Sequence, residues 1–163
     1  MKHLHPPLVD IAVNYAMPRA GLPAAASFRK WVTAVLEGRI HDANLAIRLV
    51  DEKEGLALNH HYRGKESATN VLSFPATIPE GLPKDICFPL LGDIVICAPV
   101  VAREAQLQHK PLTAHFAHLT VHGVLHLLGW NHADDKEADA MEQLERNILA
   151  ALNIQDPYQE DDR

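Results

Sequence analysis

Apolar residues recur along this chain with two periods, and the order of the two periods restricts the fold. Short apolar segments typical of strands occupy residues 8–13, 45–49, 71–74 and 94–97. Helical patterns, bounded by residues such as Pro23, Gly38 and Asp51, occupy residues 24–37, 51–62, 99–108, 113–128 and 135–152. The resulting order, β-α-β-α-β-β-α-α-α, predicts an α+β fold in which a small mixed four-stranded sheet packs with about five helices.

The length and composition of the chain suit one globular domain. Its 163 residues can bury a sizeable core, and 47% apolar with 22% charged residues is ordinary globular usage. We therefore expect a single domain over residues 1–155. Residues 156–163 end in an acidic sequence without apolar period, which predicts a disordered tail. Residues 76–89 are rich in proline and predict a long loop of the kind that is often functional or mobile.

The sequence carries no sign of a membrane or secreted protein. No segment reaches the ~18 continuous apolar residues of a membrane span, and residues 1–7 lack the apolar core of a signal peptide. Cys87 and Cys97 are too few for a disulfide framework and are expected as buried thiols. A soluble cytoplasmic protein is the simplest expectation. The net charge of −6 argues against a general basic surface for nucleic acid, so any such binding needs a local positive patch.

The segment from His122 to His132 has the spacing of a metal site. Two histidines four residues apart on a helix lie one turn above each other, so the ring nitrogens of His122 and His126 can converge on one ion. Gly129 can adopt the left-handed turn that ends a helix, and the returning chain brings His132 in as a third ligand. Three imidazole ligands that leave a fourth position for water are typical of catalytic zinc, so we predict one Zn²⁺ per chain. With 11 histidines and 8 glycines in 163 residues, chance gives this pattern in roughly 0.002 of such chains.

The residue after the first of these histidines restricts the reaction. The same histidine spacing occurs in metzincin peptidases, where a glutamate at this position is the general base. Here the position is Gly123, which cannot accept a proton from an attacking water. The pattern therefore indicates a metal hydrolase with a different substrate or a different base. His115 and His118 lie on much the same helical face, and we interpret them as groups that line or support the site.

Three segments together resemble the YbeY family of bacterial endoribonucleases. Residues 122–132, HGVLHLLGWNH, are similar to the family pattern H-G-x-L-H-L-x-G-[aromatic or His]-D-H. Residues 58–75, LNHHYRGKESATNVLSFP, and residues 91–94, LGDI, resemble two further family segments in the right order. The resemblance implies a single-strand-selective, metal-dependent endoribonuclease that acts in ribosomal RNA maturation, at the 3′ end of the small-subunit RNA, and in ribosome quality control. It also implies single-stranded RNA, ribosomal particles and assembly factors as partners, with neither DNA nor a membrane among them.

Arg63 is the residue outside the histidine motif that we predict to be catalytic. A guanidinium group matches phosphate oxygens bidentately, and cleavage of a phosphodiester needs a cation for the developing charge. The family resemblance also implies a functional arginine at this position, and Lys65 and Arg48 can add positive charge. The alternative is that Arg63 only stabilises the end of its helix through the helix dipole.

The sequence departs from the family pattern at three positions, none of which is a predicted ligand. Asn131 stands in place of an aspartate, Glu66 lengthens an aspartate by one methylene, and Ala68 replaces a proline. The general acid and base are not identified by the sequence, since Glu66, Asp93 and Asp134 are all weak candidates. Nor does the sequence decide whether water or the RNA 2′-hydroxyl is the nucleophile.

Two other functions remain open at this point. One is a metallopeptidase with an unrecognised base, against which Gly123 argues. The other is a ribosome assembly factor without catalytic activity, in which zinc only fixes the fold. A structural zinc site would unfold on chelation, whereas an open site on a formed helix would lose activity first.

Overall fold

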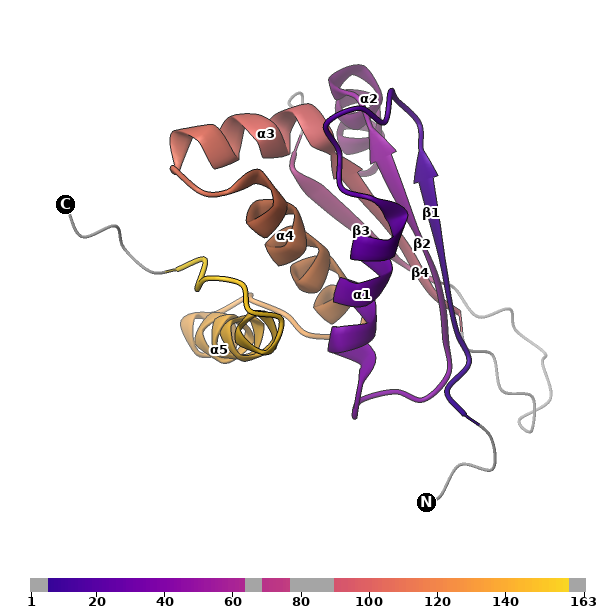
Figure 1. Cartoon of the computed structure of the whole chain (residues 1–163), viewed down its shortest axis with the longest axis vertical. Coiled ribbons are helices and arrows are strands. Elements are labelled where there is room, and N and C mark those ends of the chain that lie inside the picture. Colours follow the sequence, from indigo (N-terminus) through magenta and orange to yellow (C-terminus); the bar gives the residue numbers. More distant parts are fainter. Residues whose placement is uncertain (1–5, 64–68, 77–89, 159–163) are drawn as a thin grey trace.

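The computed structural model describes residues 6–63, 69–76 and 90–158. Within these ranges the chain forms four strands and five helices in the predicted order (Figure 1). They are β1 (Val9–Tyr15), α1 (Ala25–Leu36), β2 (Ala43–Val50), α2 (Glu52–Arg63), β3 (Val71–Pro75), β4 (Leu90–Cys97), α3 (Ala98–Leu107), α4 (Leu112–Leu127) and α5 (Asp135–Ala151). The prediction of an α+β fold with a small mixed sheet is confirmed.

The four described strands form one sheet in the order β1-β2-β4-β3. β1 pairs with β2 and β2 pairs with β4 in parallel, whereas β3 pairs with β4 in the antiparallel direction. β3 is therefore an edge strand, and it follows directly on the segment that leaves α2. This placement brings the 69–76 segment beside the histidine-bearing helix.

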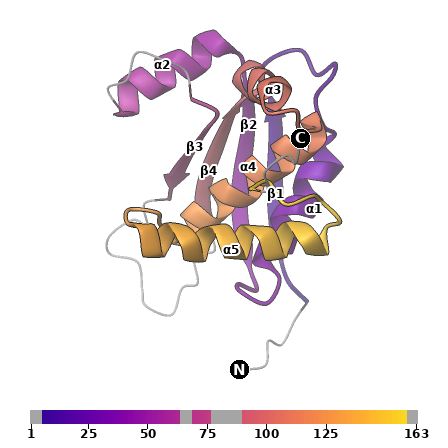
Figure 2. The same cartoon turned by 90° about the vertical axis from the view of Figure 1, so that its left-hand side faces the viewer.

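Helices cover the two faces of the sheet unequally. α1 and α4 lie against one face, and α5 crosses on the far side of α4 (Figures 1 and 2). In α1 the buried residues Phe28, Trp31, Val32 and Val35 follow the helical period that predicted them, and they join strand residues in the main core. On the other face, Leu58 of α2 packs on a smaller cluster of buried residues at one end of the sheet: Val50, Leu72, Val95, Cys97 and Val100.

α4 is the central helix of the fold. Eleven of its 16 residues are buried, because it contacts β3, β4 and the helices α1, α3 and α5. Gly123 allows the close approach to the sheet: a Cβ there would lie 3.2 Å from a methyl carbon of Ile94 and 3.3 Å from the Ser73 hydroxyl oxygen. Tight packing on several sides holds the backbone of α4 in place, which suits a helix that must present ligands with fixed geometry.

Within the segment expected as a tail, residues 156–158 are described and Tyr158 makes hydrogen bonds; residues 159–163 lie outside the described part. The expected 76–89 loop, with Cys87, lies almost entirely outside it as well. Cys97 is buried as a free thiol, as expected, and burial raises its pKa. Among the described helices, none has the length and hydropathy needed to cross a membrane.

Candidate metal centre

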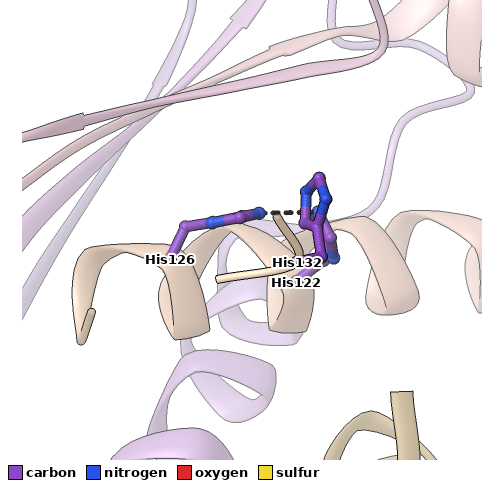
Figure 3. Close-up of side chains that lie close together, drawn as sticks. All are labelled: His122, His126 and His132. Carbon is purple, nitrogen blue, oxygen red and sulfur yellow. Dashed lines mark hydrogen bonds between the residues drawn. The ribbon is translucent and has the colours of Figure 1, made fainter. Parts of the chain in front are cut away.

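His122, His126 and His132 converge in the structure (Figure 3). One potential ligand atom from each ring lies within 4.8 Å of the corresponding atoms of the other two. The Nε2 atoms of His122 and His126 are 3.0 Å apart, and the ring centroids of His126 and His132 are 4.9 Å apart. The predicted clustering of these three residues is therefore confirmed.

The chain turns back after α4 in the manner that the glycine predicted. Gly129 has a φ of +96°, a left-handed conformation that strains any residue with a Cβ. The Gly129 N–H donates to the His126 carbonyl and the Trp130 N–H donates to the Leu125 carbonyl, which is the Schellman arrangement at a helix end. The returning segment then places His132 beside the last turn of α4.

Asn131 stabilises this return locally. Its Oδ1 accepts a hydrogen bond of 2.8 Å from the backbone N–H of His132, and its side chain is exposed. This interaction needs only an acceptor oxygen, which an amide supplies as well as a carboxylate. The replacement of the family aspartate by Asn131 therefore leaves the support of His132 intact.

A buried carboxylate behind the histidines orients one of them. Glu145 of α5 is fully buried, and its Oε2 lies 2.7 Å from Nδ1 of His122. His118 Nε2 lies 3.1 Å from the other carboxylate oxygen, and the Tyr158 hydroxyl donates to that same oxygen. When the proton of His122 is on Nδ1 and points at Glu145, the lone pair of its Nε2 points toward His126 and His132.

The charge state of Glu145 follows from these three donors. Burial by itself would raise the pKa of the carboxyl, but hydrogen bonds from His118, His122 and Tyr158 outweigh burial and lower the pKa to about 2. Since the pKa lies below its ordinary value of about 4.3, the group is ionised from mildly acidic pH upwards. Burial and the same contact raise the pKa of Tyr158, so that side chain remains a neutral donor.

The donor set fits a transition metal, as the distances expected for zinc illustrate. Zn–N bonds of about 2.0–2.1 Å at the tetrahedral angle place two nitrogens roughly 3.3 Å apart, close to the 3.0 Å between the two Nε2 atoms. Burial, followed by the proximity of His122 and His132, lowers the pKa of His126, which favours the neutral imidazole that a metal requires. His132 is exposed and the other two are half-buried, so the side of the cluster opposite α4 is open.

A groove of about 750 Å³ runs along this open side. One wall is the edge strand β3 with the preceding Thr69 and Asn70, and the other contains the three histidines, His118, Leu119 and Tyr158. No carboxylate lines the groove in the part of the chain that the structure describes. A ligand in the groove therefore meets imidazoles and backbone groups, with the charge of Glu145 buried behind them.

The other residues considered from sequence fall in several places. Arg63 is the last residue of α2, but its side chain is not among the described ones, and Lys65 and Glu66 lie outside the described residues altogether. Arg48 pairs with Glu54 at 2.6 Å on the opposite face of the sheet, so it adds no positive charge beside the histidines. Asp93 shares that face.

Asp134 and His115 have structural contacts instead. Asp134 caps α5 by accepting from the backbone N–H of Glu137 at 2.8 Å. His115 is buried and lies 2.9 Å from a carboxylate oxygen of Glu104, about two helical turns before His122. Of the two neighbouring histidines, only His118 supports the three clustered histidines, and it does so through its contact with Glu145.

The sequence analysis missed Glu145 and Tyr158. A signal for Glu145 was present, because it lies four residues after Met141 and three before Ile148, within the apolar stripe of its helix. A carboxylate on the buried face of a helix needs a partner, and the unassigned histidines of α4 were the available donors. Tyr158 carried no comparable signal in its segment.

The first prediction concerns the contact between Glu145 and His122. Glu145→Gln keeps the size of the side chain but removes the charge that fixes the His122 tautomer, so we expect metal affinity to fall about 10- to 100-fold. Competition against a chromogenic chelator measures this directly. Asp139→Asn, which removes an exposed carboxylate from the same helix, is the matched control and should bind metal normally. Wild-type affinity in Glu145→Gln would show that the carboxylate does not support the ligand.

Comparison with known proteins agrees with the site. The family model described as Endoribonuclease YbeY matches residues 20–153. A protein named Endoribonuclease YbeY from Xanthomonas oryzae pv. oryzae is 76% identical over 150 residues, which cover 92% of this chain and 93% of that protein. Proteins of the same name from Xanthomonas axonopodis pv. citri and Stenotrophomonas maltophilia are each 74% identical over 153 residues, with 94% of this chain and 95% of the relative covered.

A solved structure supports the fold independently. The solution structure of a Thermotoga maritima protein matches with a TM-score of 0.57 and 21% sequence identity, over 94% of this chain and all of that one. The family model covers strands β2, β3 and β4, the histidine helix and α5. The chain therefore belongs to the YbeY family of endoribonucleases.

Proposed function

We propose that this chain is a zinc-dependent endoribonuclease that cleaves single-stranded RNA in the groove beside β3. The observation that carries the proposal is the convergence of His122, His126 and His132 on the groove of a chain whose relatives are named as endoribonucleases. We infer one Zn²⁺ per chain, because three imidazoles with an open fourth position suit that ion.

Each group has a distinct part in the proposed reaction. The three histidines would hold a zinc ion, which would supply an activated water near neutral pH and positive charge beside the scissile phosphate. Glu145 holds His122 in the tautomer that binds, and the packing of α4 keeps the first two ligands in register. Arg63, at the end of α2, is proposed to bind the phosphate and to stabilise the charge that develops on it.

Membership of the family supports a proposal for the cellular role. We propose that the substrate is ribosomal RNA, with maturation of the small-subunit 3′ end and ribosome quality control as the processes. Ribosomal particles and their assembly factors are the proposed partners, and the cytoplasm is the proposed location. The acidic net charge agrees with a protein that meets RNA at one local site instead of over a broad basic surface.

Incubation of the metal-loaded protein with matched single-stranded and duplex RNA tests the proposal. We expect endonucleolytic cleavage of the single strand, little cleavage of the duplex, and loss of activity on chelation while the melting transition persists. The main core is made of apolar residues of the sheet, α1, α3, α4 and α5, and the three histidines are not among them. Unfolding on chelation would favour the assembly factor with a structural zinc.

The metallopeptidase alternative has a separate readout in the same assay. Gly123 faces Ile94 and Ser73, so no proton acceptor stands at that position and a glutamate placed there would clash with the sheet. We therefore expect no digestion of an unstructured protein such as casein. Digestion that chelator stops, together with intact RNA, would replace the nuclease proposal by the peptidase one.

A further inference from the structure

The edge of β3 that faces the groove has an unusual set of hydrogen-bonding groups. In the antiparallel pair with β4, the backbone carbonyl of Asn70 accepts from the Cys97 N–H, and the Ala76 N–H donates to the backbone carbonyl of Leu91. Residues of an antiparallel strand alternate in direction, so residues 70, 72, 74 and 76 bond to β4. Val71, Ser73 and Pro75 then direct their backbone groups to the outer edge.

This outer edge is rich in acceptors and poor in donors. The Val71 N–H is already bonded to Oδ1 of Asn70 at 2.7 Å, and Pro75 has no N–H. Ser73 supplies the one remaining donor of the three residues, whereas all three supply a carbonyl oxygen. No described strand pairs with this side of β3, and all residues from Thr69 to Pro75 line the groove.

Such an edge suits some ligands and excludes others. An extended peptide that added to the sheet would need donors and acceptors in alternation, and two of the three donors are missing. Phosphate oxygens are acceptors themselves and would gain nothing from carbonyls. The complementary ligand is a strand that carries a row of donors, namely hydroxyl or amino groups.

We propose that the carbonyls of Val71, Ser73 and Pro75 accept hydrogen bonds from ribose 2′-hydroxyls of the RNA strand, and that this edge selects RNA over DNA. The proposal rests on the proposed function and deepens it, because the 2′-hydroxyl is the donor that RNA has and DNA lacks. The edge lies across the groove from the three histidines, so it contacts nucleotides that flank the cleaved bond.

The spacing of these carbonyls also favours an unstacked strand. Alternate residues of a β-strand are about 6.8 Å apart and lie on a nearly straight line, whereas the riboses of a duplex wind around a helical axis. A single strand that unstacks can extend its backbone and present one ribose to each carbonyl in turn. A duplex turns successive riboses away from any straight line, so it cannot present a row of 2′-hydroxyls to the edge of β3.

Single 2′-fluoro substitutions in an RNA oligonucleotide test the proposal on the metal-loaded protein. Fluorine keeps the size of the hydroxyl but cannot donate, so at two or three consecutive nucleotides beside the cleaved bond we expect KM to rise about 3- to 10-fold with little change in kcat. The nucleotide whose 2′-hydroxyl adjoins the cleaved phosphate is left unmodified, since that hydroxyl is a potential nucleophile. Replacing adenosine by purine riboside at the same positions removes an amino group and should have no effect.

A measurement on the protein locates the contact. The metal-stripped full chain is used because it is not expected to cleave the RNA. In this sample the carbonyl ¹³C resonances of Val71, Ser73 and Pro75 should shift when the RNA is added. They should keep their positions when DNA of the same sequence is added. The carbonyls of Leu72 and Phe74, which point at β4, are the internal control.

The outcomes separate this inference from the function on which it rests. If RNA is cleaved with an unchanged KM at every 2′-fluoro position and the three carbonyl resonances do not shift, the inference is wrong and the proposed nuclease function stands. A loss of affinity with purine riboside but not with 2′-fluoro would overturn it in favour of base amino groups. If the protein neither binds nor cleaves RNA, the proposed function fails first.

Discussion

Replacing His122, His126 or His132 by alanine is expected to abolish metal binding in each case. Two remaining imidazoles cannot hold a zinc ion against water at the affinity of three, because each of the three protein ligands contributes to the binding free energy. Mass spectrometry under native conditions should show one ion per chain in the wild type and none in the variants. RNA cleavage should fall to background in parallel.

The same variants should remain folded. His132 is exposed and the other two histidines are half-buried, whereas the packing of α4 depends on apolar residues such as Phe116, Val121 and Leu125. His60→Ala removes an exposed histidine of α2 and serves as the control, with full metal content expected. Full occupancy in all three ligand variants would show that the metal is held elsewhere.

The cluster of His122, His126 and His132 could be predicted from the sequence because its geometry is local. Residues four apart on a helix share a face, and a glycine in the left-handed conformation folds the chain back within three residues. Both rules depend only on backbone geometry, and the position of Gly129 satisfies them. The order of strands and helices along the chain was predictable for the same reason, because the period of the apolar residues within each segment indicates whether that segment is a strand or a helix.

The support of the cluster could not be derived in this way. Glu145 and Tyr158 reach the histidines from 23 and 40 positions away along the chain, through the packing of α5 and the segment after it across α4. No local pattern fixes that crossing. The groove and the outward carbonyls of β3 likewise depend on which strand lies at the edge of the sheet, and the sequence period alone does not order the strands.

Arg48 shows the opposite error, in which a residue type suggested a role that its position excludes. It was considered as part of a positive patch, and its place on β2 puts it on the face away from α4, paired with Glu54. Neighbouring positions on a strand point to opposite faces, so Ile47 enters the core and Arg48 cannot reach the groove. Because Arg48 lies on the other face of the sheet, it is a useful control for Arg63.

Arg63→Ala is expected to keep the metal and the fold while RNA cleavage falls by ~10²–10³, equivalent to about 2.7–4 kcal/mol of lost transition-state stabilisation. The reason is that a preorganised guanidinium acts on the charge of the reacting phosphate and takes no part in holding the ion. Arg63→Lys should restore only part of the rate, because an ammonium keeps the charge but loses the planar pair of donors. Single-turnover cleavage, zinc content and melting temperature are measured on the same samples.

A purely structural role for Arg63 predicts a different pattern. A cation at a helix end contributes under about 1 kcal/mol through the dipole, so Arg63→Ala would then melt slightly earlier and cleave almost normally. Arg48→Ala, which removes a guanidinium from the other face of the sheet, should show that second pattern whichever role Arg63 has. Because the two arginines differ in position and not in chemistry, a rate loss confined to Arg63→Ala would place phosphate binding at the end of α2, and equal rates in the two variants would remove Arg63 from the reaction.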